Sequence, residues 1–409
     1  MFRTGLRLFK SNKRKFSSFV GKTGGVIIKD KLIQHNVKDV FMYTGGAIMP
    51  VIDAFYNSEI NYYINTHEQS LGHAATGYAR TSGKPGICIV TSGPGLTNMV
   101  TAITDAQTDS TPLIVFSGQV PKKAMGTQAF QECPSVDITK SITKWSYCVN
   151  DIEELSSVVD KAFYIASDGK PGVVHIDLPK CITQSIFTVE NEINSNKYIQ
   201  DKEKTSETLI KKDNKLQTTN LGVSLDNKLQ TTNLGVSLDN TSIFTEESLT
   251  DLVLLINDSK RPVIIAGKGC NRSYHKLRQL ATTSNIPVTT TIHGMGLFDE
   301  RDPLSLEFLG MHGNVAANYA VQNADLIINL GSRFDDRTTG NVESYAPKAK
   351  AAYTNGIGGI IHVNICEDDI CSNIKSNYNF NCDTDEWLNY LVPRVRYKPR
   401  WNWLLQISG

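Results

Sequence analysis

The chain has 409 residues, of which 40% are hydrophobic and 20% charged, and its formal net charge is +1. This length allows two or three domains, each large enough to bury a core. A near-neutral chain gives no reason to expect nucleic-acid binding, and no apolar run approaches the roughly 18–20 residues that span a membrane. The eight cysteines form no Cys-x-x-Cys pair, which favours free thiols in a reducing compartment.

The start of the chain is basic and contains no acidic residue before Asp30. Arginine and lysine are interspersed there with phenylalanine, leucine and serine. An acid-free amphipathic leader is typical of a mitochondrial transit peptide, which we assign to residues 1–20. This segment predicts a mitochondrial protein, and a basic tail with no targeting role is the alternative.

Residues 21–184 alternate short apolar runs with helical patterns. The apolar runs predict strands at residues 40–43, 62–64, 87–90, 113–116 and 171–179. The helical patterns lie at residues 26–33, 50–55, 71–80, 96–108 and 145–165. Strands that alternate with helices predict a doubly wound parallel sheet.

Two glycine turns in this region each follow an apolar run. They are Thr44-Gly45-Gly46 and residues 91–95 (TSGPG), and Glu68 lies between them in the sequence. In open α/β sheets, ligands bind where such turns meet at the carboxyl edge of the strands. Glu68 is therefore the first candidate functional residue, and a capping residue at the start of a helix is the alternative.

Residues 185–245 are rich in Asn, Lys, Ser, Thr and Glu and poor in large apolar side chains. Within them, residues 213–225 are repeated without change at residues 226–238. Two short polar copies are too few to build a repeat fold. We predict a disordered, low-complexity linker between two domains.

A second α/β pattern occupies residues 246–392, with apolar runs at residues 263–266, 286–291, 324–330 and 360–364. Each run ends in glycine or polar residues, which predicts a second doubly wound, Rossmann-like sheet with a ligand-binding edge. A lone Gly-x-Gly such as Gly267-Lys268-Gly269 is by itself a weak sign of nucleotide binding. Residues 393–409 are predicted to form a tail outside this domain.

Motifs along the chain resemble those of thiamine-diphosphate enzymes, and in particular those of the acetolactate synthase (acetohydroxyacid synthase) family. They are residues 43–47 (YTGGA), 67–69 (HEQ), 91–95 (TSGPG), 118–121 (GQVP) and 331–341 (GSRFDDRTTGN). The resemblance runs from about residue 19 to about residue 403, with a break at the linker. It implies that residues 21–184 form a pyrimidine-binding domain and residues 246–392 a central FAD-binding domain.

For the first domain, the resemblance implies contact with thiamine diphosphate. Glu68 would supply a proton to the ring nitrogen of the aminopyrimidine. Gly46 and Gln131 would also take part in catalysis, Gln131 by hydrogen bonding to the substrate or the bound intermediate. The resemblance adds three residues near the same end of the cofactor: Tyr43, Thr91 and Asn98.

For the second domain, the resemblance implies FAD binding, to which arginine side chains and backbone amides are suited through the diphosphate. The implied contacts are Gly267, Gly269, Thr291, Ile292, His293, Met311, His312, Gly331, Ser332, Arg333, Asp335, Arg337, Asn364 and Asp383, with Lys170 from the first domain. Lys170 stands where the family has Arg, His293 where Gln is common and Asn364 where Glu is common. We expect these three contacts to differ from the family pattern.

The resemblance further implies a reaction that joins pyruvate to a second pyruvate or to 2-oxobutyrate with loss of CO₂, in the synthesis of valine, leucine and isoleucine. It implies a homodimer or tetramer, because the family's active sites form between chains, and it allows a regulatory subunit. Mg²⁺ completes the cofactor set of the family, but its Gly-Asp-Gly motif and the Asn that follows have no match in this sequence. We therefore assign no metal ligand.

Three functions stay open on the sequence alone. The first is an acetolactate synthase that is inactive without the missing C-terminal domain. The second is another thiamine-dependent 2-oxo acid decarboxylase or carboligase, and the third is a non-catalytic FAD-binding or interaction fragment. The coding sequence after Gly409 separates them, because a Gly-Asp-Gly…Asn domain there would favour an enzyme.

Overall fold

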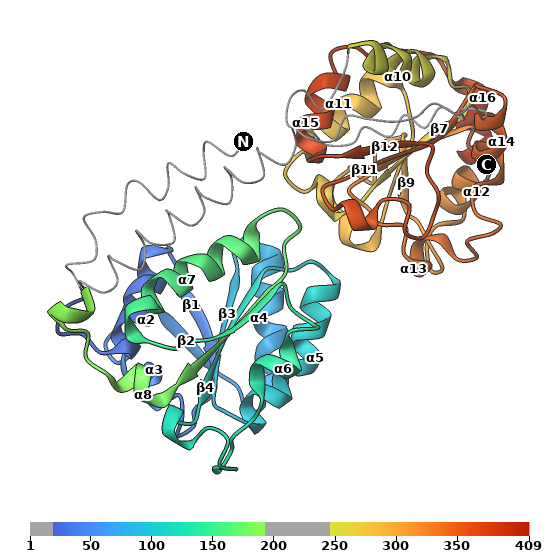
Figure 1. The fold of residues 1–409 in the computed structure, drawn as a ribbon. Helices are drawn as coiled ribbons and strands as arrows, with labels where there is room; N and C mark the ends of the chain where they lie inside the picture. Colours follow the sequence, from blue (N-terminus) through green and yellow to red (C-terminus); the bar gives the residue numbers. More distant parts are fainter. Residues whose placement is uncertain (1–18, 193–245, 409) are drawn as a thin grey trace, which may run out of the picture. The chain divides into compact units, whose positions relative to one another are not determined.

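The computed structural model describes residues 19–192 and 246–408. It forms two compact units, each with its own sheet (Figure 1). Each unit also has its own buried apolar side chains. Most of the predicted leader and most of the predicted linker, including the repeat, lie outside the described residues.

The first unit is built on six parallel strands in the order β2-β1-β3-β4-β6-β5 (Figure 1). The strands are β1 (Asp39–Met42), β2 (Asn61–Ile64), β3 (Gly86–Val90), β4 (Leu113–Gln119), β5 (Trp145–Cys148) and β6 (Val173–Pro179). The helices are α2 (Gly24–Gln34), α3 (Met49–Asp53), α4 (Glu68–Ser82), α5 (Pro94–Thr108), α6 (Ser135–Thr139), α7 (Ile152–Ser167) and α8 (Lys180–Gln184), with a 3₁₀ turn η2 (Lys122–Ala124).

Helices cover both faces of this sheet, which confirms the predicted doubly wound architecture. Alternate residues of β4 enter different cores: Ile114 and Phe116 pack with α2 and α7, whereas Leu113 and Val115 pack with α4 and α5. Because both faces are buried, the central strands read as continuous apolar runs rather than as alternating ones. This is why the sequence pattern located them.

Two features of the first unit differ from the sequence expectations. The predicted helical segment is wrong at its start, since residues 145–148 form the edge strand β5 and α7 begins only at Ile152. Trp145 and Tyr147 alternate with polar residues and stack with their ring centroids 5.3 Å apart, an arrangement that favours a strand. Phe19 and Phe187 also belong to this core, 2% and 3% exposed, although both lie just outside the predicted bounds of 21–184.

The second unit has six parallel strands in the order β12-β11-β10-β7-β8-β9. They are β7 (Pro262–Ala266), β8 (Val288–Thr290), β9 (Ser305–Phe308), β10 (Leu326–Leu330), β11 (Gly359–Asn364) and β12 (Tyr378–Asn381). From β7 the chain proceeds to β8 and β9 on one side, and from β10 to β11 and β12 on the other. The direction therefore switches between β7 and β10, where ligands bind in folds of this kind.

Helices also cover both faces of the second sheet. They are α10 (Glu246–Asp258), α11 (Tyr274–Ser284), α12 (Val315–Asn323), α13 (Asp336–Thr339), α14 (Pro347–Thr354), α15 (Thr384–Leu391) and α16 (Trp401–Ser408), with 3₁₀ turns η3 (Lys268–Cys270), η4 (Ile292–Gly294) and η5 (Glu367–Asp369). The core on one face takes side chains from α10, α11 and α15, and the core on the other from α12, α14 and α16.

The prediction of a tail outside the domain is wrong for residues 393–408, which pack into the second unit. Trp403 is 2% exposed and donates its indole N–H to the Pro262 carbonyl at 3.0 Å. The Arg400 guanidinium donates to the carbonyls of Ile256 and Ser259 at 2.9 and 3.2 Å. Burial lowers the pKa of Arg400 to about 10. These carbonyl contacts satisfy the buried cation, and α16 then completes the core.

Candidate functional site

The carboxyl ends of β1 and β3 meet at the point where the first sheet changes direction. The Tyr43 amide donates to the Ile89 carbonyl at 3.0 Å, which continues the pairing of the two strands into the turns. A Cβ on Gly45 would collide with the Thr91 side chain. The two predicted glycine turns are therefore in direct contact, and glycine at residue 45 is what lets them approach.

Glu68 lies in this contact as the first residue of α4 and is only 6% exposed. Its Oε2 accepts a hydrogen bond of 2.9 Å from Asn98 Nδ2, in the first turns of α5. Its Oε1 lies 3.7 Å from the position that a Cβ on Gly95 would take. The structure thus brings three predicted residues together: Glu68, Thr91 and Asn98.

The Thr91 hydroxyl is buried and has no hydrogen-bond partner. Leaving such a group unpaired costs about 1–3 kcal/mol, so an unpaired buried hydroxyl needs an explanation. Here it borders the same turn as Glu68, since a Cβ on Gly95 would lie 2.8 Å from Thr91 Cγ2. The Thr91 hydroxyl therefore remains available to a polar partner beside Glu68.

The other predicted residues of the first unit occupy different places. Gln131 lies over the 91–95 turn, because a Cβ on Gly93 would be 2.7 Å from the Gln131 carbonyl oxygen. Tyr43 is half-buried, and Gly46 is exposed with open space where a Cβ would be. Lys170 precedes β6 at the amino edge of the sheet, so the structure does not bring it to Glu68.

A buried polar network beneath this edge was missed by the sequence reasoning. Ser117 donates to Asp177 Oδ1 at 2.6 Å and contacts His175 Nε2 at 2.8 Å, while Thr139 contacts His175 Nδ1 at 2.7 Å. The Gln119 amide donates to Asp177 Oδ2 at 2.9 Å. Although Ser, His and Asp occur together, the histidine touches two hydroxyls rather than the carboxylate, and all are buried. The network is therefore a structural one and not a nucleophilic triad.

Burial moves the pKa values of this network in opposite senses. It raises the pKa of Asp177 from 3.8 to about 6 and lowers that of His175 from 6.5 to about 3. The raised carboxyl pKa contributes stability that is lost as pH rises through about 6, and the difference corresponds to about 3 kcal/mol. The depressed histidine pKa contributes stability that is lost as pH falls below 6.5. The two contributions oppose one another between about pH 4 and 6.

We predict that Asp177→Asn makes the contribution of His175 to the pH dependence of stability measurable. In this variant, the free energy of unfolding should rise more steeply with pH between about 4 and 6.5 than in the wild type, because the opposing carboxyl contribution is gone. Urea unfolding at several pH values measures it. Asp53→Asn, at an exposed position on α3, is the control and should keep the wild-type slope. An unchanged slope in Asp177→Asn would show that this carboxyl group does not titrate in that range.

In the second unit, the turns after β7 and β10 meet backbone to backbone. The Gly269 amide donates to the Gly331 carbonyl at 3.1 Å, and a Cβ on Gly331 would lie 2.5 Å from Gly269 Cα. Gly331 also has a φ of 61°, which favours glycine. Two of the predicted glycine positions are thus required by packing at the switch point.

The predicted FAD contacts of this unit gather along one edge of the sheet. Thr291, Ile292 and His293 follow β8, Met311 and His312 follow β9, Ser332 to Arg337 follow β10, and Asn364 and Asp383 end or follow β11 and β12. Asp335 and Asp383 also cap helices, accepting from the Thr338 and Asp385 amides at 3.0 and 2.8 Å. Helix capping by itself explains why aspartate stands at these two positions, so neither position requires a bound ligand.

Two polar residues under this edge were missed. Asn329 Nδ2 and His362 Nε2 both donate to the Ser332 carbonyl, at 2.9 and 2.7 Å, and Asn364 Nδ2 adds a contact at 3.3 Å. Burial lowers the pKa of His362, so the ring is neutral and Nε2 carries its proton. The three side chains fix the turn that precedes Arg333. The sequence signal that could have identified Asn329 and His362 is a polar residue inside an apolar run.

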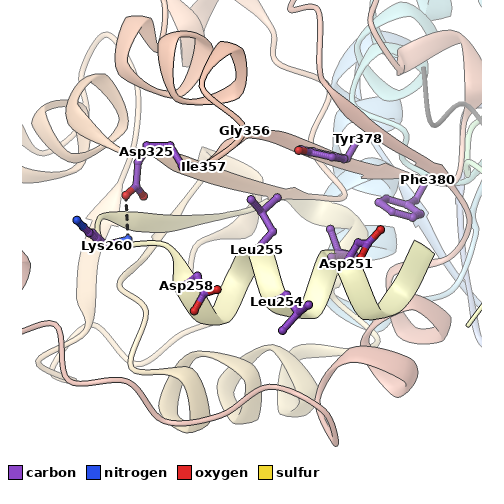
Figure 2. Close-up of a pocket in the computed structure, with 11 residues that line it drawn as sticks. Asp251, Leu254, Leu255, Asp258, Lys260, Asp325, Gly356, Ile357, Tyr378 and Phe380 are labelled. Carbon is purple, nitrogen blue, oxygen red and sulfur yellow. Dashed lines mark hydrogen bonds between the residues drawn. The ribbon is translucent and has the colours of Figure 1, made fainter. Parts of the chain in front are cut away.

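A cavity of about 500 Å³ lies elsewhere on the second unit, between α10 and the start of β12 (Figure 2). Leu252, Leu255, Tyr378 and Phe380 are among its lining residues. Its lining includes Lys260 and Asp325, which precede β7 and β10 at the amino edge of the sheet. Because the predicted FAD contacts lie at the carboxyl edge, this cavity is not part of that site.

Within residues 19–192 and 246–408, no helix combines the length and the apolar character needed to cross a membrane. In the same part of the chain, no three His, Cys, Asp or Glu side chains are grouped so that they could hold a metal ion.

Both units match known domain families. Residues 22–140 match the thiamine pyrophosphate enzyme N-terminal TPP binding domain, and residues 249–391 match the thiamine pyrophosphate enzyme central domain. The chain therefore belongs to the thiamine pyrophosphate enzyme family.

Acetolactate synthases are among its curated relatives. The chain is 42% identical over 397 residues to the mitochondrial acetolactate synthase catalytic subunit of Saccharomyces cerevisiae, covering 96% of this chain and 53% of the relative. It is 41% identical over 399 residues to the mitochondrial acetolactate synthase of Schizosaccharomyces pombe, covering 96% and 55%. It is 38% identical over 382 residues to the acetolactate synthase isozyme 1 large subunit of Escherichia coli, covering 93% and 59%. The chain thus spans about half the length of the curated relatives it matches.

Proposed function

We propose that this chain supplies the pyrimidine-binding and FAD-binding domains of an acetolactate synthase catalytic subunit. The proposed reaction joins pyruvate to a second pyruvate or to 2-oxobutyrate with loss of CO₂. The observation that carries the proposal is the Glu68–Asn98 pair beside the unpartnered Thr91 hydroxyl at the carboxyl edge of the first sheet. The 96% of the chain that aligns with the Saccharomyces cerevisiae catalytic subunit supports it.

The side chains at this edge fit the aminopyrimidine end of thiamine diphosphate. That ring presents a ring nitrogen, which needs a proton donor, and polar groups that need hydrogen-bond partners. Asn98 holds one oxygen of Glu68, so the other oxygen can face the ring nitrogen. The Thr91 hydroxyl supplies a further partner. When bound, the cofactor provides the electron sink for decarboxylation of the 2-oxo acid.

The residues of this chain would hold and orient the cofactor ring and the 2-oxo acid. Glu68 would donate a proton to the ring nitrogen, and the start of α4 fixes the position of its side chain. Gly46 leaves open space beside the first turn, where a 2-oxo acid can approach. The side-chain amide of Gln131, on the loop above the 91–95 turn, donates a hydrogen bond to that substrate.

The same proposal places FAD along the carboxyl edge of the second sheet. The close glycine contact at Gly269 and Gly331 presents backbone at the switch point. Arg333 and Arg337, in the turn that follows, suit the diphosphate. The proposal also includes Mg²⁺, a homodimer or tetramer, and a regulatory subunit. It further includes a mitochondrial location, which the names of the fungal relatives support.

Complementation tests the function. We expect the purified chain to be yellow with bound flavin. Mixed with a complete catalytic subunit whose own residue at the position of Glu68 is replaced by Gln, it should restore acetolactate formation from pyruvate, thiamine diphosphate and Mg²⁺. The complete subunit supplies the part of its length that this sequence does not span, and only the added chain supplies the glutamate. A purified chain without bound flavin, together with a mixture that forms no acetolactate, would contradict the proposal.

A further inference from the structure

The loop between β4 and β5 sets where Gln131 lies. The Gln131 backbone touches the 91–95 turn at Gly93, where an added Cβ would be 2.7 Å from the Gln131 carbonyl oxygen. Gly95, two residues further along that turn, faces Glu68 Oε1. A shift of residue 131 would therefore change its distance from the carboxyl group on which the proposed site is built.

The tip of this loop, residues 126–132, has an unfavourable backbone. Gly126, Gln128 and Gln131 have φ values of 80°, 60° and 60°. Left-handed backbone is disfavoured for Gln128 and Gln131 because each carries a Cβ. Phe130, between them in the turn, is 89% exposed and contributes little packing. Such a tip needs polar contacts to hold its shape.

A single carboxylate supplies those contacts. Glu132 Oε1 accepts from the Gly126 amide, and Oε2 accepts from the Ala129 amide at 3.0 Å. The Glu132 amide in turn donates to the Ala129 carbonyl at 2.9 Å. The Gly126 amide is the main reason why the pKa of Glu132 lies below its usual range. The carboxylate is therefore charged at neutral pH, and its hydrogen bonds to the amides are charge-assisted.

The base of the loop is anchored independently of Glu132. The Gln119 side chain donates from Nε2 to the Cys133 carbonyl and to Asp177 Oδ2, both at 2.9 Å. Asp177 is 2% exposed and belongs to the buried network under the sheet edge. Loss of the Glu132 contacts should therefore free the tip and leave the fold of the unit intact.

We propose that Glu132 is a positioning residue, whose carboxylate holds the 126–132 turn and so keeps Gln131 against the 91–95 turn. That Gln131 meets a 2-oxo acid there rests on the proposed function. That Glu132 holds the turn rests on the contacts alone, so the two parts can fail separately.

Hydrogen exchange on the full chain tests the holding of the turn. Glu132→Gln keeps the shape of the side chain but turns an –NH₂ group toward one of the two backbone amides. We expect amides 126–131 to exchange about tenfold faster, a change of about 1.4 kcal/mol. The control is Asp137→Asn, an acid 72% exposed on α6 that pairs with Lys140, and it should leave this exchange unchanged. Equal exchange in the wild type and Glu132→Gln would overturn the proposal.

Turnover in the complementation mixture tests whether the position of Gln131 affects catalysis. Glu132→Gln should lower the turnover number about tenfold and leave thiamine diphosphate affinity unchanged, because Glu68, Thr91 and Asn98 are untouched. Faster exchange with wild-type turnover would show that the position of Gln131 does not matter, and would also overturn the proposal. If the wild-type mixture is inactive, the proposed function fails, and the exchange comparison still decides whether Glu132 holds the turn.

Discussion

Replacing Glu68 by Gln is expected to lower thiamine-dependent turnover by about 100-fold or more, the range that a positioned proton donor contributes. The substitution preserves shape, so Asn98 Nδ2 can still donate to the side-chain oxygen as it does to Oε2 at 2.9 Å. The new –NH₂ group can donate a hydrogen bond to the cofactor ring but cannot give up a proton to it. Cofactor binding should therefore persist while turnover is lost.

The measurement pairs turnover in the complementation mixture with thiamine diphosphate binding by calorimetry. Glu59→Gln makes the same chemical change at an exposed position and should behave as the wild type. Bound flavin should be equal in all three proteins, because the second unit is unaltered. Wild-type turnover in Glu68→Gln would remove the assigned role of this residue.

Replacing Gly331 by Ala is expected to release FAD and to lower the free energy of unfolding of the second unit by about 3 kcal/mol. Part of this is the cost of a Cβ at a φ of 61°, about 1–2 kcal/mol. The rest is overpacking, because the Cβ would lie 2.5 Å from Gly269 Cα and backbone cannot move aside as a flexible side chain can. Separation of the two turns would also displace the residues before Arg333.

Gly356→Ala is the matched control for this prediction. Gly356 has a φ of 70°, but no atom lies within 4 Å of its Cβ position, and it precedes β11 at the amino edge. It should therefore show only the conformational cost of about 1–2 kcal/mol and keep its flavin. Flavin absorbance measures the bound FAD of both variants, and urea unfolding measures their stability. Equal losses in the two would mean that the contact between the turns has no role in FAD binding.

The parts of the fold that could be predicted were those with a purely local signal. β3, β4 and β10 are buried on both faces, and their continuous apolar runs are enough to locate them. The edge strands β9 and β12 are short and mix polar with apolar residues, so no run marks them. The tail could not be assigned, because only the folded unit shows which carbonyls Arg400 satisfies.

The residues of the candidate site also fall into those with a local sequence signal and those without one. Glu68 was found because glycine turns flank it in the sequence, and Asn98 and Thr91 came from the family resemblance. The Gln119–Asp177 network was missed because it depends on strand register: Ser117 stands opposite Asp177 on neighbouring strands that are far apart in the sequence. The role of Glu132 was missed for a related reason, since its amide contacts exist only once residues 126–131 have turned back on themselves.

A structure of the chain bound to thiamine diphosphate tests the central claim most directly. We expect the aminopyrimidine ring nitrogen to lie within hydrogen-bond distance of Glu68, about 2.6–3.2 Å, and the Thr91 hydroxyl to gain a partner. A cofactor ring bound away from the turns at Gly45 and Thr91, with Glu68 still paired only to Asn98, would contradict it.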